Sequence, residues 1–315
     1  MKVLIPDSLP LSLDSSHNEI EFIPYSVSST DFTGVQDSEF LVLWMNTDEN
    51  LRAAVEQLTN LKLVQTLAAG PDHVLSAGFP MSVAIASGRS LHDKTVTEHA
   101  LALTLSAIRN LDSLREAQNR SFWDQEFIAA QAAPTTQSLY TLNGAEVLII
   151  GFGSIAAQFA PVLTSLGAHV RGVARKGGER AGYEVTPISE ISSLLSQADV
   201  VISLLPYAAE SEKYFNDAFF NKMKASSIFI NVGRGKTVDE LALVRALSEK
   251  KIRKASIDVT FAEPLPADSP LWHCPNLTIT PHVSGGRPLD SEKLILANSE
   301  NLLHSREITN LVVRI

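Results

Sequence analysis

A short apolar run, a glycine-rich turn and a helical pattern constrain the fold of this chain most strongly. Residues 147–150 (Val-Leu-Ile-Ile) are all apolar, as in a strand buried on both faces. Residues 151–153 (Gly-Phe-Gly) make a tight turn, and residues 154–166 then have helical apolar spacing. Such a unit gathers free N–H groups and the positive end of a helix dipole at one point, which suits a pyrophosphate. The pattern is G-x-G-x-x-A, ending at Ala156, and it predicts dinucleotide binding; the alternative is an ordinary strand-to-helix turn.

Length, charge and cysteine content limit the other possibilities. The chain has 315 residues, enough for about two domains. Its net charge of -9 argues against nucleic acid or an anionic membrane as the main partner. A single cysteine, Cys274, excludes an internal disulfide framework and a cysteine-rich metal site, so we expect no metal and a reducing compartment. No stretch reaches the length of a membrane span and the apolar run near Met1 is too short for a signal peptide, so we expect a cytoplasmic protein.

The pattern along the chain indicates an α/β protein with two similar halves. In the first 90 residues short apolar runs alternate with helical patterns, which predicts a parallel sheet covered by helices on both faces. One long helix is expected at 96–118, followed by an irregular crossover loop at 119–143. Beyond the glycine turn, further strands are expected at 169–174, 200–204, 228–231, 255–259 and 277–279, and helices at 188–196, 211–223, 238–249 and 291–305, before an apolar tail at 308–313.

Three polar clusters follow strands of the second half. Arg234 stands between two glycines, and its planar guanidinium suits a bidentate grip on a carboxylate. Asp258 and Glu263 follow the next strand, and His282 follows the last one. Histidine titrates near neutral pH, and a carboxylate partner such as Glu263 would raise its pKa and orient its ring. Arginine, glutamate and histidine beside a dinucleotide turn predict reduction of a 2-oxo acid to a 2-hydroxy acid, and the reverse reaction.

Over essentially its whole length, the chain resembles the D-isomer-specific 2-hydroxyacid dehydrogenases. The resemblance rests on motifs in the family's order: 61–72, 96–103, 151–156, Leu205-Pro206 with Ser211, 231–235, Asp258 with 263–266, and 280–282. It implies two Rossmann-like, doubly wound parallel-sheet domains: a flavodoxin-like substrate domain, residues 1–95 and 287–315, and an inserted NAD(P)-binding domain, residues 96–286. By that resemblance Arg234 binds and polarises the 2-oxo acid, Glu263 supports His282, and His282 is the general acid and base.

The resemblance also implies the residues that contact the ligands. Backbone at Ala69 and Gly70 would meet the substrate carboxylate together with Arg234 and His282, and Asp258 would lie near the nicotinamide carboxamide. The other expected cofactor-binding residues are Gly151, Gly153, Ser154, Ile155, Arg175, Lys176, Leu205, Pro206, Ser211, Val232, Gly233, His282, Ser284 and Gly285.

One departure from the family bears on the cofactor. NAD enzymes place an acid after the second strand of the domain to bind the ribose diol, whereas this chain has Val173-Ala174 followed by Arg175 and Lys176. Two cations suit a 2′-phosphate, so we expect NADP(H) to be preferred over NAD(H); the alternative is that both are solvated loop residues.

Alternatives remain open at this point. A nucleotide-sensing binding protein of the same fold can retain Arg234, Glu263 and His282. A formate dehydrogenase would pair the histidine with glutamine, so Glu263 argues against it. A short form of phosphoglycerate dehydrogenase is also possible. We expect a small 2-oxo or 2-hydroxy acid of the glyoxylate or hydroxypyruvate type as substrate, and, by the resemblance, a homodimer formed through the inserted domain.

Overall fold

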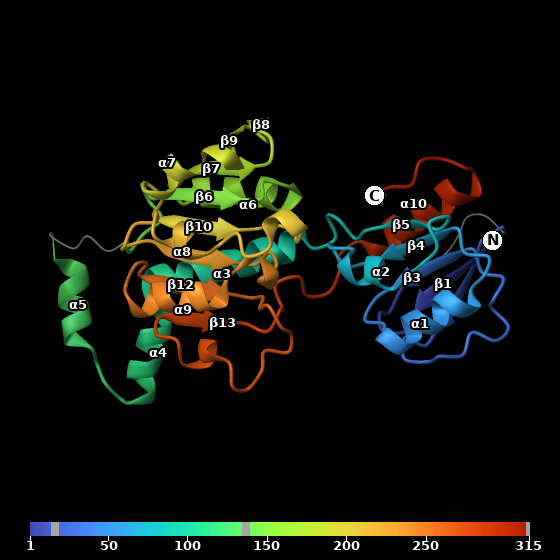
Figure 1. Cartoon of the computed structure of the whole chain (residues 1–315), viewed down its shortest axis with the longest axis horizontal. Helices are drawn as coiled ribbons and strands as arrows, with labels where there is room; N and C mark the ends of the chain where they lie inside the picture. The colour runs from blue at the N-terminus through green and yellow to red at the C-terminus, as the bar shows by residue number, and fades with distance from the viewer. Residues whose placement is uncertain (14–18, 134–138, 313–315) are drawn as a thin grey trace. The chain divides into compact units, whose positions relative to one another are not determined.

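The structure, a computed structural model, describes residues 1–13, 19–133 and 139–312. The chain divides into two compact units, one of Met1–His92 with Arg287–Ile315 and one of Asp93–Gly286 (Figure 1). Each unit contains its own sheet and its own apolar core.

The first unit is a five-stranded parallel sheet in the order β2-β1-β3-β4-β5. This is the strand order of flavodoxin-like folds, the fold type that the family resemblance implied for this domain. Its elements are β1 Lys2–Pro6, β2 Glu21–Tyr25, β3 Phe40–Leu43, α1 Asp48–Gln57, β4 Leu63–Thr66, α2 Asp72–Ser76, β5 Ala84–Ala86 and α10 Ser291–Leu303.

Helices cover both faces of this sheet, because successive residues of a buried strand point to opposite sides. On one face Leu51 of α1 packs in a cluster with Leu41, and on the other Ile295 of α10 packs with Phe40. A buried polar contact adds specificity: the Asn298 amide of α10 donates to Gln65 Oε1 of β4 at 2.7 Å. The last helix of the chain therefore belongs to the first unit.

The second unit is an eight-stranded sheet in the order β13-β12-β11-β10-β6-β7-β9-β8. The hairpin β8–β9 is antiparallel and the other pairs are parallel. Its strands are β6 Glu146–Ile150, β7 His169–Ala174, β8 Gly178–Arg180, β9 Tyr183–Pro187, β10 Val200–Ser203, β11 Ile228–Asn231, β12 Lys254–Ile257 and β13 Leu277–Ile279. Its helices are α3 Asp93–Arg109, α4 Leu111–Asn119, α5 Gln125–Ala132, α6 Ser154–Ser165, α7 Ser192–Leu195, α8 Asp217–Phe220 and α9 Glu240–Ser248.

The strand order of the second unit fixes where a ligand binds. The chain moves outward from β6 in one direction through β7 and β9, and then returns to β10 on the other side of β6. The crevice at the carboxyl ends of β6 and β10 is therefore the topological switch point of a Rossmann sheet, where such folds bind dinucleotides. Helices α3 and α6 pack on one face, through Leu103 and Phe159, and α8 and α9 on the other, through Phe220 and Leu243.

Three local predictions were wrong. The helix expected at 96–118 is broken into α3 and α4 by Asn110, which has a left-handed φ of 53° that asparagine tolerates better than most residues. The loop expected at 119–143 contains α5, which has no buried residue and so no apolar stripe to reveal it; residues 134–138 lie outside the described part. The helix expected at 211–223 is only the short α8, because Lys213 has a φ of 49° and the helix begins at the Asn216 cap.

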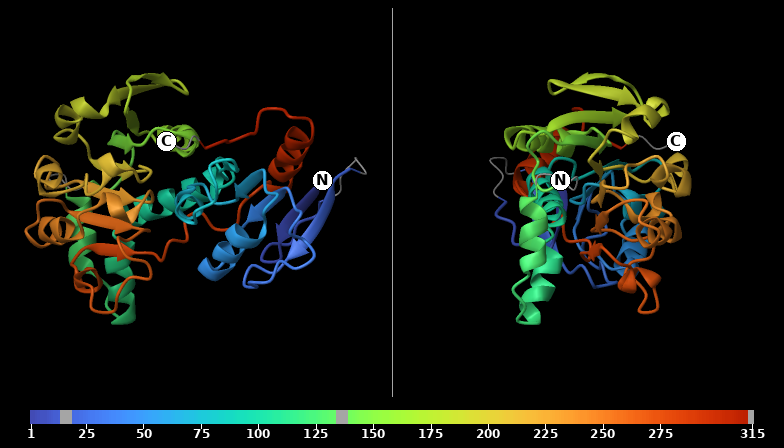
Figure 2. Two further views of the ribbon diagram at one scale, coloured as in Figure 1. Left: turned by 45° about the vertical axis from the view of Figure 1, so that its right-hand side comes forward. Right: turned by 90° about the vertical axis from the view of Figure 1, so that its left-hand side faces the viewer.

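The sequence also gave no indication of the hairpin β8–β9, which follows β7 directly. Figure 2 shows this hairpin, in yellow-green, at the outer edge of the second unit's sheet. In the described residues no helix is both long and apolar enough to cross a membrane.

Candidate active site

The turn after β6 brings the backbone close to the neighbouring strand. Gly151 has a φ of 98°, and a Cβ there would lie 2.7 Å from the carbonyl of Leu204, at the end of β10. Gly153 is the N-cap of α6, and a Cβ there would meet no atom within 4 Å among the described residues. The first glycine is thus required by the protein itself, whereas the second leaves the helix N-terminus accessible to an anion. Ala156 is fully buried, so a methyl group fits the third position.

The first residues of α6 are held from another helix of the same unit. The Ser154 hydroxyl donates to Asp93 Oδ1 of α3 at 3.1 Å. Ile155 packs against the core on the α3 side of the sheet. These contacts fix the direction of the helix N-terminus, which a phosphate-binding turn needs because its N–H groups must converge.

Basic residues follow β7 near the same turn. Arg175 and Lys176 come directly after the strand and are both exposed. Arg180 of β8 reaches back from the hairpin: its Nη1 donates to Phe152 O in the glycine turn at 3.0 Å, and its Nη2 donates to Lys176 O at 2.8 Å. Arg180 thus ties the basic loop to the glycine turn. Sequence reasoning missed Arg180, because its contact depends on the unpredicted hairpin.

The segment after β10 forms the opposite wall of the crevice. The Ser211 hydroxyl accepts the Ala208 N–H at 2.8 Å and lies 3.1 Å from Pro206 O, which closes this loop on itself. Leu205 is partly buried against the core, and its carbonyl oxygen would be 2.7 Å from a Cβ at Gly233. The loops after β10 and β11 therefore approach each other more closely than side chains would allow.

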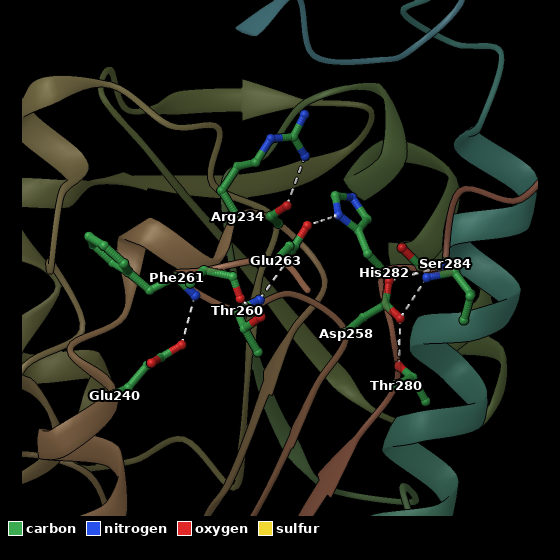
Figure 3. Close-up of polar contacts among 12 residues, drawn as sticks. Arg234, Glu240, Asp258, Thr260, Phe261, Glu263, Thr280, His282 and Ser284 are labelled. Carbon is green, nitrogen blue, oxygen red and sulfur yellow. Dashed lines mark hydrogen bonds and ion pairs between the residues drawn. The ribbon is translucent and has the colours of Figure 1, made fainter. Parts of the chain in front are cut away.

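The loop after β11 is held by several backbone contacts around Arg234. Asn231 accepts the Gly233 N–H at 3.1 Å, and the Thr237 hydroxyl donates to Arg234 O at 2.6 Å. A Cβ at Gly235 would lie 1.9 Å from Thr260 O, so glycine is required there. Val232 is buried, and the guanidinium of Arg234 donates to Gly233 O at 2.9 Å (Figure 3). The loop backbone is therefore fixed, and one guanidinium nitrogen of Arg234 is hydrogen-bonded to it.

Glu263 and His282 form a direct pair at the ends of β12 and β13. Glu263 Oε2 lies 2.7 Å from His282 Nδ1, and Glu263 Oε1 accepts the Thr260 N–H at 3.0 Å (Figure 3). Partial burial by itself raises the pKa of Glu263, but the hydrogen bonds from His282 and Thr260 and the charges of His282 and Arg234 lower it below the ordinary 4.5. Glu263 is therefore ionised near neutral pH and accepts a proton-bearing Nδ1. This leaves His282 Nε2 as the atom that can exchange a proton with a substrate.

Asp258 holds the backbone on which His282 stands. His282 has a left-handed φ of 52°, and its N–H donates to the Asp258 backbone carbonyl at 2.7 Å. The Asp258 carboxylate accepts the Val283 N–H at 3.0 Å and the Ser284 N–H at 2.8 Å. Three successive N–H groups thus bind one residue. The Gly285 carbonyl, which comes next, accepts the Thr95 hydroxyl of α3 at 2.6 Å. Asp258 thus supports this turn, and its expected place beside the nicotinamide carboxamide stays a prediction.

The structure therefore brings Arg234, Glu263 and His282 together at one edge of the second unit's sheet, on the side of the glycine turn. Figure 3 shows Arg234 and His282 extending to the same side, with Glu263 between them. Ala69 and Gly70 belong to the first unit, in the turn after β4. A guanidinium that can grip a carboxylate stands beside an imidazole held by a carboxylate, which is an arrangement suited to proton transfer at an anionic carbonyl compound.

Comparisons with known proteins agree on one family. Residues 101–284 match the family model described as D-isomer specific 2-hydroxyacid dehydrogenase, NAD binding domain. Glyoxylate/hydroxypyruvate reductase A of Citrobacter koseri is 28% identical over 89% of this chain and 88% of its own length. The structure of a D-isomer specific 2-hydroxyacid dehydrogenase family protein from Aeromonas salmonicida has a TM-score of 0.83 at 27% identity, covering 99% of this chain and 98% of that one.

A further solved structure shares the fold at lower identity. It is the NADPH-dependent glyoxylate/hydroxypyruvate reductase of Sinorhizobium meliloti, with a TM-score of 0.79 at 21% identity, covering 99% of this chain and 97% of that one.

Proposed function

The chain belongs to the D-isomer specific 2-hydroxyacid dehydrogenase family and is an NAD(P)-dependent oxidoreductase, and we propose that it reduces small 2-oxo acids of the glyoxylate and hydroxypyruvate type. The observation that carries this proposal is the 2.7 Å pair of His282 and Glu263 with Arg234 beside it. The named relative that spans most of the chain supports the choice of substrate.

Each of the three residues has a separate role in the proposed reaction. The bound nicotinamide supplies the hydride. Arg234 grips the substrate carboxylate and polarises the adjacent carbonyl through its planar guanidinium. His282 delivers the proton from Nε2 to the carbonyl oxygen and takes it back in the reverse direction. Glu263 keeps the proton on Nδ1 and stabilises the charged ring, so that Nε2 faces the substrate.

The glycine turn is the proposed pyrophosphate site. The close approach at Gly151 and the open position at Gly153 fit a dinucleotide, since the N–H groups at the start of α6 are the donors that a pyrophosphate needs. Arg175 and Lys176 are exposed where NAD enzymes place an acid, which supports a preference for NADP(H), with NAD(H) as the weaker cofactor. Arg180 supports the same preference, because it holds the loop that carries both cations.

The first unit is the proposed substrate domain. The turn that follows strand β4 contains Ala69 and Gly70. The Ala68 N–H donates to Thr66 Oγ1, and the Ala68 carbonyl accepts the Gly88 N–H at 2.8 Å. A backbone fixed in this way presents its next N–H groups in a constant direction, which suits recognition of a substrate carboxylate.

The helices α4 and α5 support a homodimer. Figure 1 shows α5 standing apart from the sheet of the second unit. Trp123, just before it, is 77% exposed, and Phe122 and Ile128 are exposed as well. A groove of about 480 Å³ lies beside them, lined by Arg109, Phe127, Ile128, Gln131, Ala132, Tyr140 and Thr141. Apolar side chains gathered on a projecting arm are typical of a surface that another subunit covers.

Cys274, which is free, is compatible with a cytoplasmic location.

The test is a turnover assay with a panel of 2-oxo acids, including glyoxylate and hydroxypyruvate, each with NADPH and with NADH. We expect rapid oxidation of NADPH with one of these two acids. Cofactor binding without turnover of any 2-oxo acid would favour the rival function, a nucleotide-sensing binding protein. The variant His282→Ala, which we expect to have lost its proton donor, is the control for background oxidation.

A further inference from the structure

We propose that His99 of α3 is a positioning residue, which holds the turn carrying His282 through a hydrogen-bonded chain formed by Thr280 and Asp258. The inference rests on the proposed role of His282. It assigns a function to a histidine that neither binds the glycine turn nor contacts Glu263.

The contacts link a helix to the ends of two strands. His99 Nε2 lies 3.0 Å from Thr280 Oγ1, after β13, and 3.4 Å from Asp258 Oδ1, after β12. The Thr280 hydroxyl lies 2.5 Å from Asp258 Oδ1. The Asp258 side chain is fully buried and that of His99 is 23% exposed. Figure 3 shows Thr280 and Ser284 on either side of the Asp258 carboxylate.

The direction of the hydrogen bonds follows from counting protons. The two Asp258 oxygens accept the Val283 and Ser284 N–H groups, so this carboxyl group acts as a hydrogen-bond acceptor. The Thr280 hydroxyl has a single proton, and its short contact to this carboxylate shows where that proton goes. Thr280 Oγ1 can then only accept from His99, so Nε2 of His99 must carry a proton.

The turn needs this support because its backbone is strained. His282 has a φ of 52°, a conformation that non-glycine residues adopt at a cost and keep only when their surroundings impose it. Asp258 imposes it, through its backbone carbonyl and both carboxylate oxygens, on residues 282 to 284. A buried carboxylate stays in one orientation only while its partners are in place. His99 and Thr280 are the side chains that fix Asp258 Oδ1.

Removing the His99 donor should therefore disturb the position of His282 Nε2 and leave Arg234 and the glycine turn after β6 unchanged. Small misplacements of a reacting group have large effects on rate, up to about a hundredfold for 1 Å. We expect kcat to fall while the KM values change little, because Arg234 and the glycine turn remain as they are.

The experiment compares three variants in the full chain. His99→Phe keeps the ring volume but has no donor, and kcat should fall by about 10- to 100-fold, with the KM values for oxo acid and NADPH within about twofold of wild type. His99→Gln can still donate to Thr280 and should recover most of kcat. Glu98→Gln, an exposed neighbour on α3, is the control and should match wild type. A His99→Phe enzyme with wild-type kcat, or a His99→Gln enzyme as impaired as His99→Phe, would overturn the inference.

A measurement on the unmodified chain tests the geometry independently of turnover. Long-range ¹H–¹⁵N NMR spectra of the histidine rings, with His99 assigned from the signal lost in His99→Gln, should show a proton on Nε2. A ring protonated at Nδ1 alone would overturn the inference even if the enzyme is active. If no 2-oxo acid is turned over, the proposed function fails, and this spectrum alone then decides whether His99 supports the turn.

Discussion

The two glycines of the turn after β6 should respond to alanine substitution in opposite ways. Gly151 has a φ of 98°, and the new Cβ would lie 2.7 Å from the carbonyl carbon and oxygen of Leu204. Gly153 has a φ of -106°, which alanine adopts readily, and no described atom lies within 4 Å of the new Cβ. Gly151→Ala should therefore destabilise the protein, whereas Gly153→Ala should impair only the binding of the cofactor.

The magnitudes follow from this geometry. A left-handed conformation costs alanine about 1–2 kcal/mol, and the reduced freedom of the unfolded chain returns about 0.4–1 kcal/mol. The clash with the rigid backbone at Leu204 adds to the cost, so we expect Gly151→Ala to lose about 2 kcal/mol or more. This lowers Tm by roughly 4–8 °C for a domain of this size. For Gly153→Ala the same entropic gain and the poorer N-cap nearly cancel, and stability should change by less than about 1 kcal/mol.

Gly153→Ala should weaken cofactor binding, although it leaves the stability of the fold nearly unchanged. A methyl group at Gly153 would keep a pyrophosphate away from the first N–H groups of α6. Loss of one charged hydrogen bond is worth about 1.5–3 kcal/mol, which is roughly a 10- to 150-fold rise in Kd. Thermal unfolding without cofactor and titration of NADPH, followed by its fluorescence, measure the two effects separately. A Gly153→Ala protein that binds NADPH with the wild-type Kd would refute the assignment of the turn.

Changes at the reacting residues should separate their roles. His282→Ala should lower kcat by roughly 10²–10⁴-fold, whereas Arg234→Ala should also raise the KM for the oxo acid; steady-state kinetics showing near wild-type turnover in either would contradict its role. Glu263 has a folded pKa below 4.5, so its stabilising effect is complete above 4.5 and is lost as the pH falls through the folded pKa. The Tm advantage of wild type over Glu263→Gln should therefore shrink between pH 6 and strongly acidic pH, and a constant difference would contradict this linkage. Arg175→Ala should reduce kcat/KM for NADPH about thirtyfold, equivalent to ~2 kcal/mol, and leave NADH nearly unchanged; an equal loss for both cofactors would argue for a solvated loop residue.

The sequence alone determined the features that depend on neighbouring residues. The strand, glycine turn and helix around Gly151 could be predicted because each part has a local requirement, namely apolar side chains, a positive φ and helical spacing. The α/β class followed from alternating patterns in the same way. The family resemblance added the return of the last helix to the first unit, which no local pattern shows.

The tertiary structure decided the features that depend on residues distant in the chain. Arg180 binds the Phe152 carbonyl only because a short hairpin turns β8 back toward the glycine turn. His99 meets Asp258 across more than 150 positions of sequence, because α3 packs against β11 and β12. The break at Asn110 was missed because helical spacing continues on both sides of it, and the exposed helix α5 has no buried face that a pattern could reveal. Backbone preferences depend on adjacent residues, whereas the partner of a buried polar group depends on how the helices and strands pack.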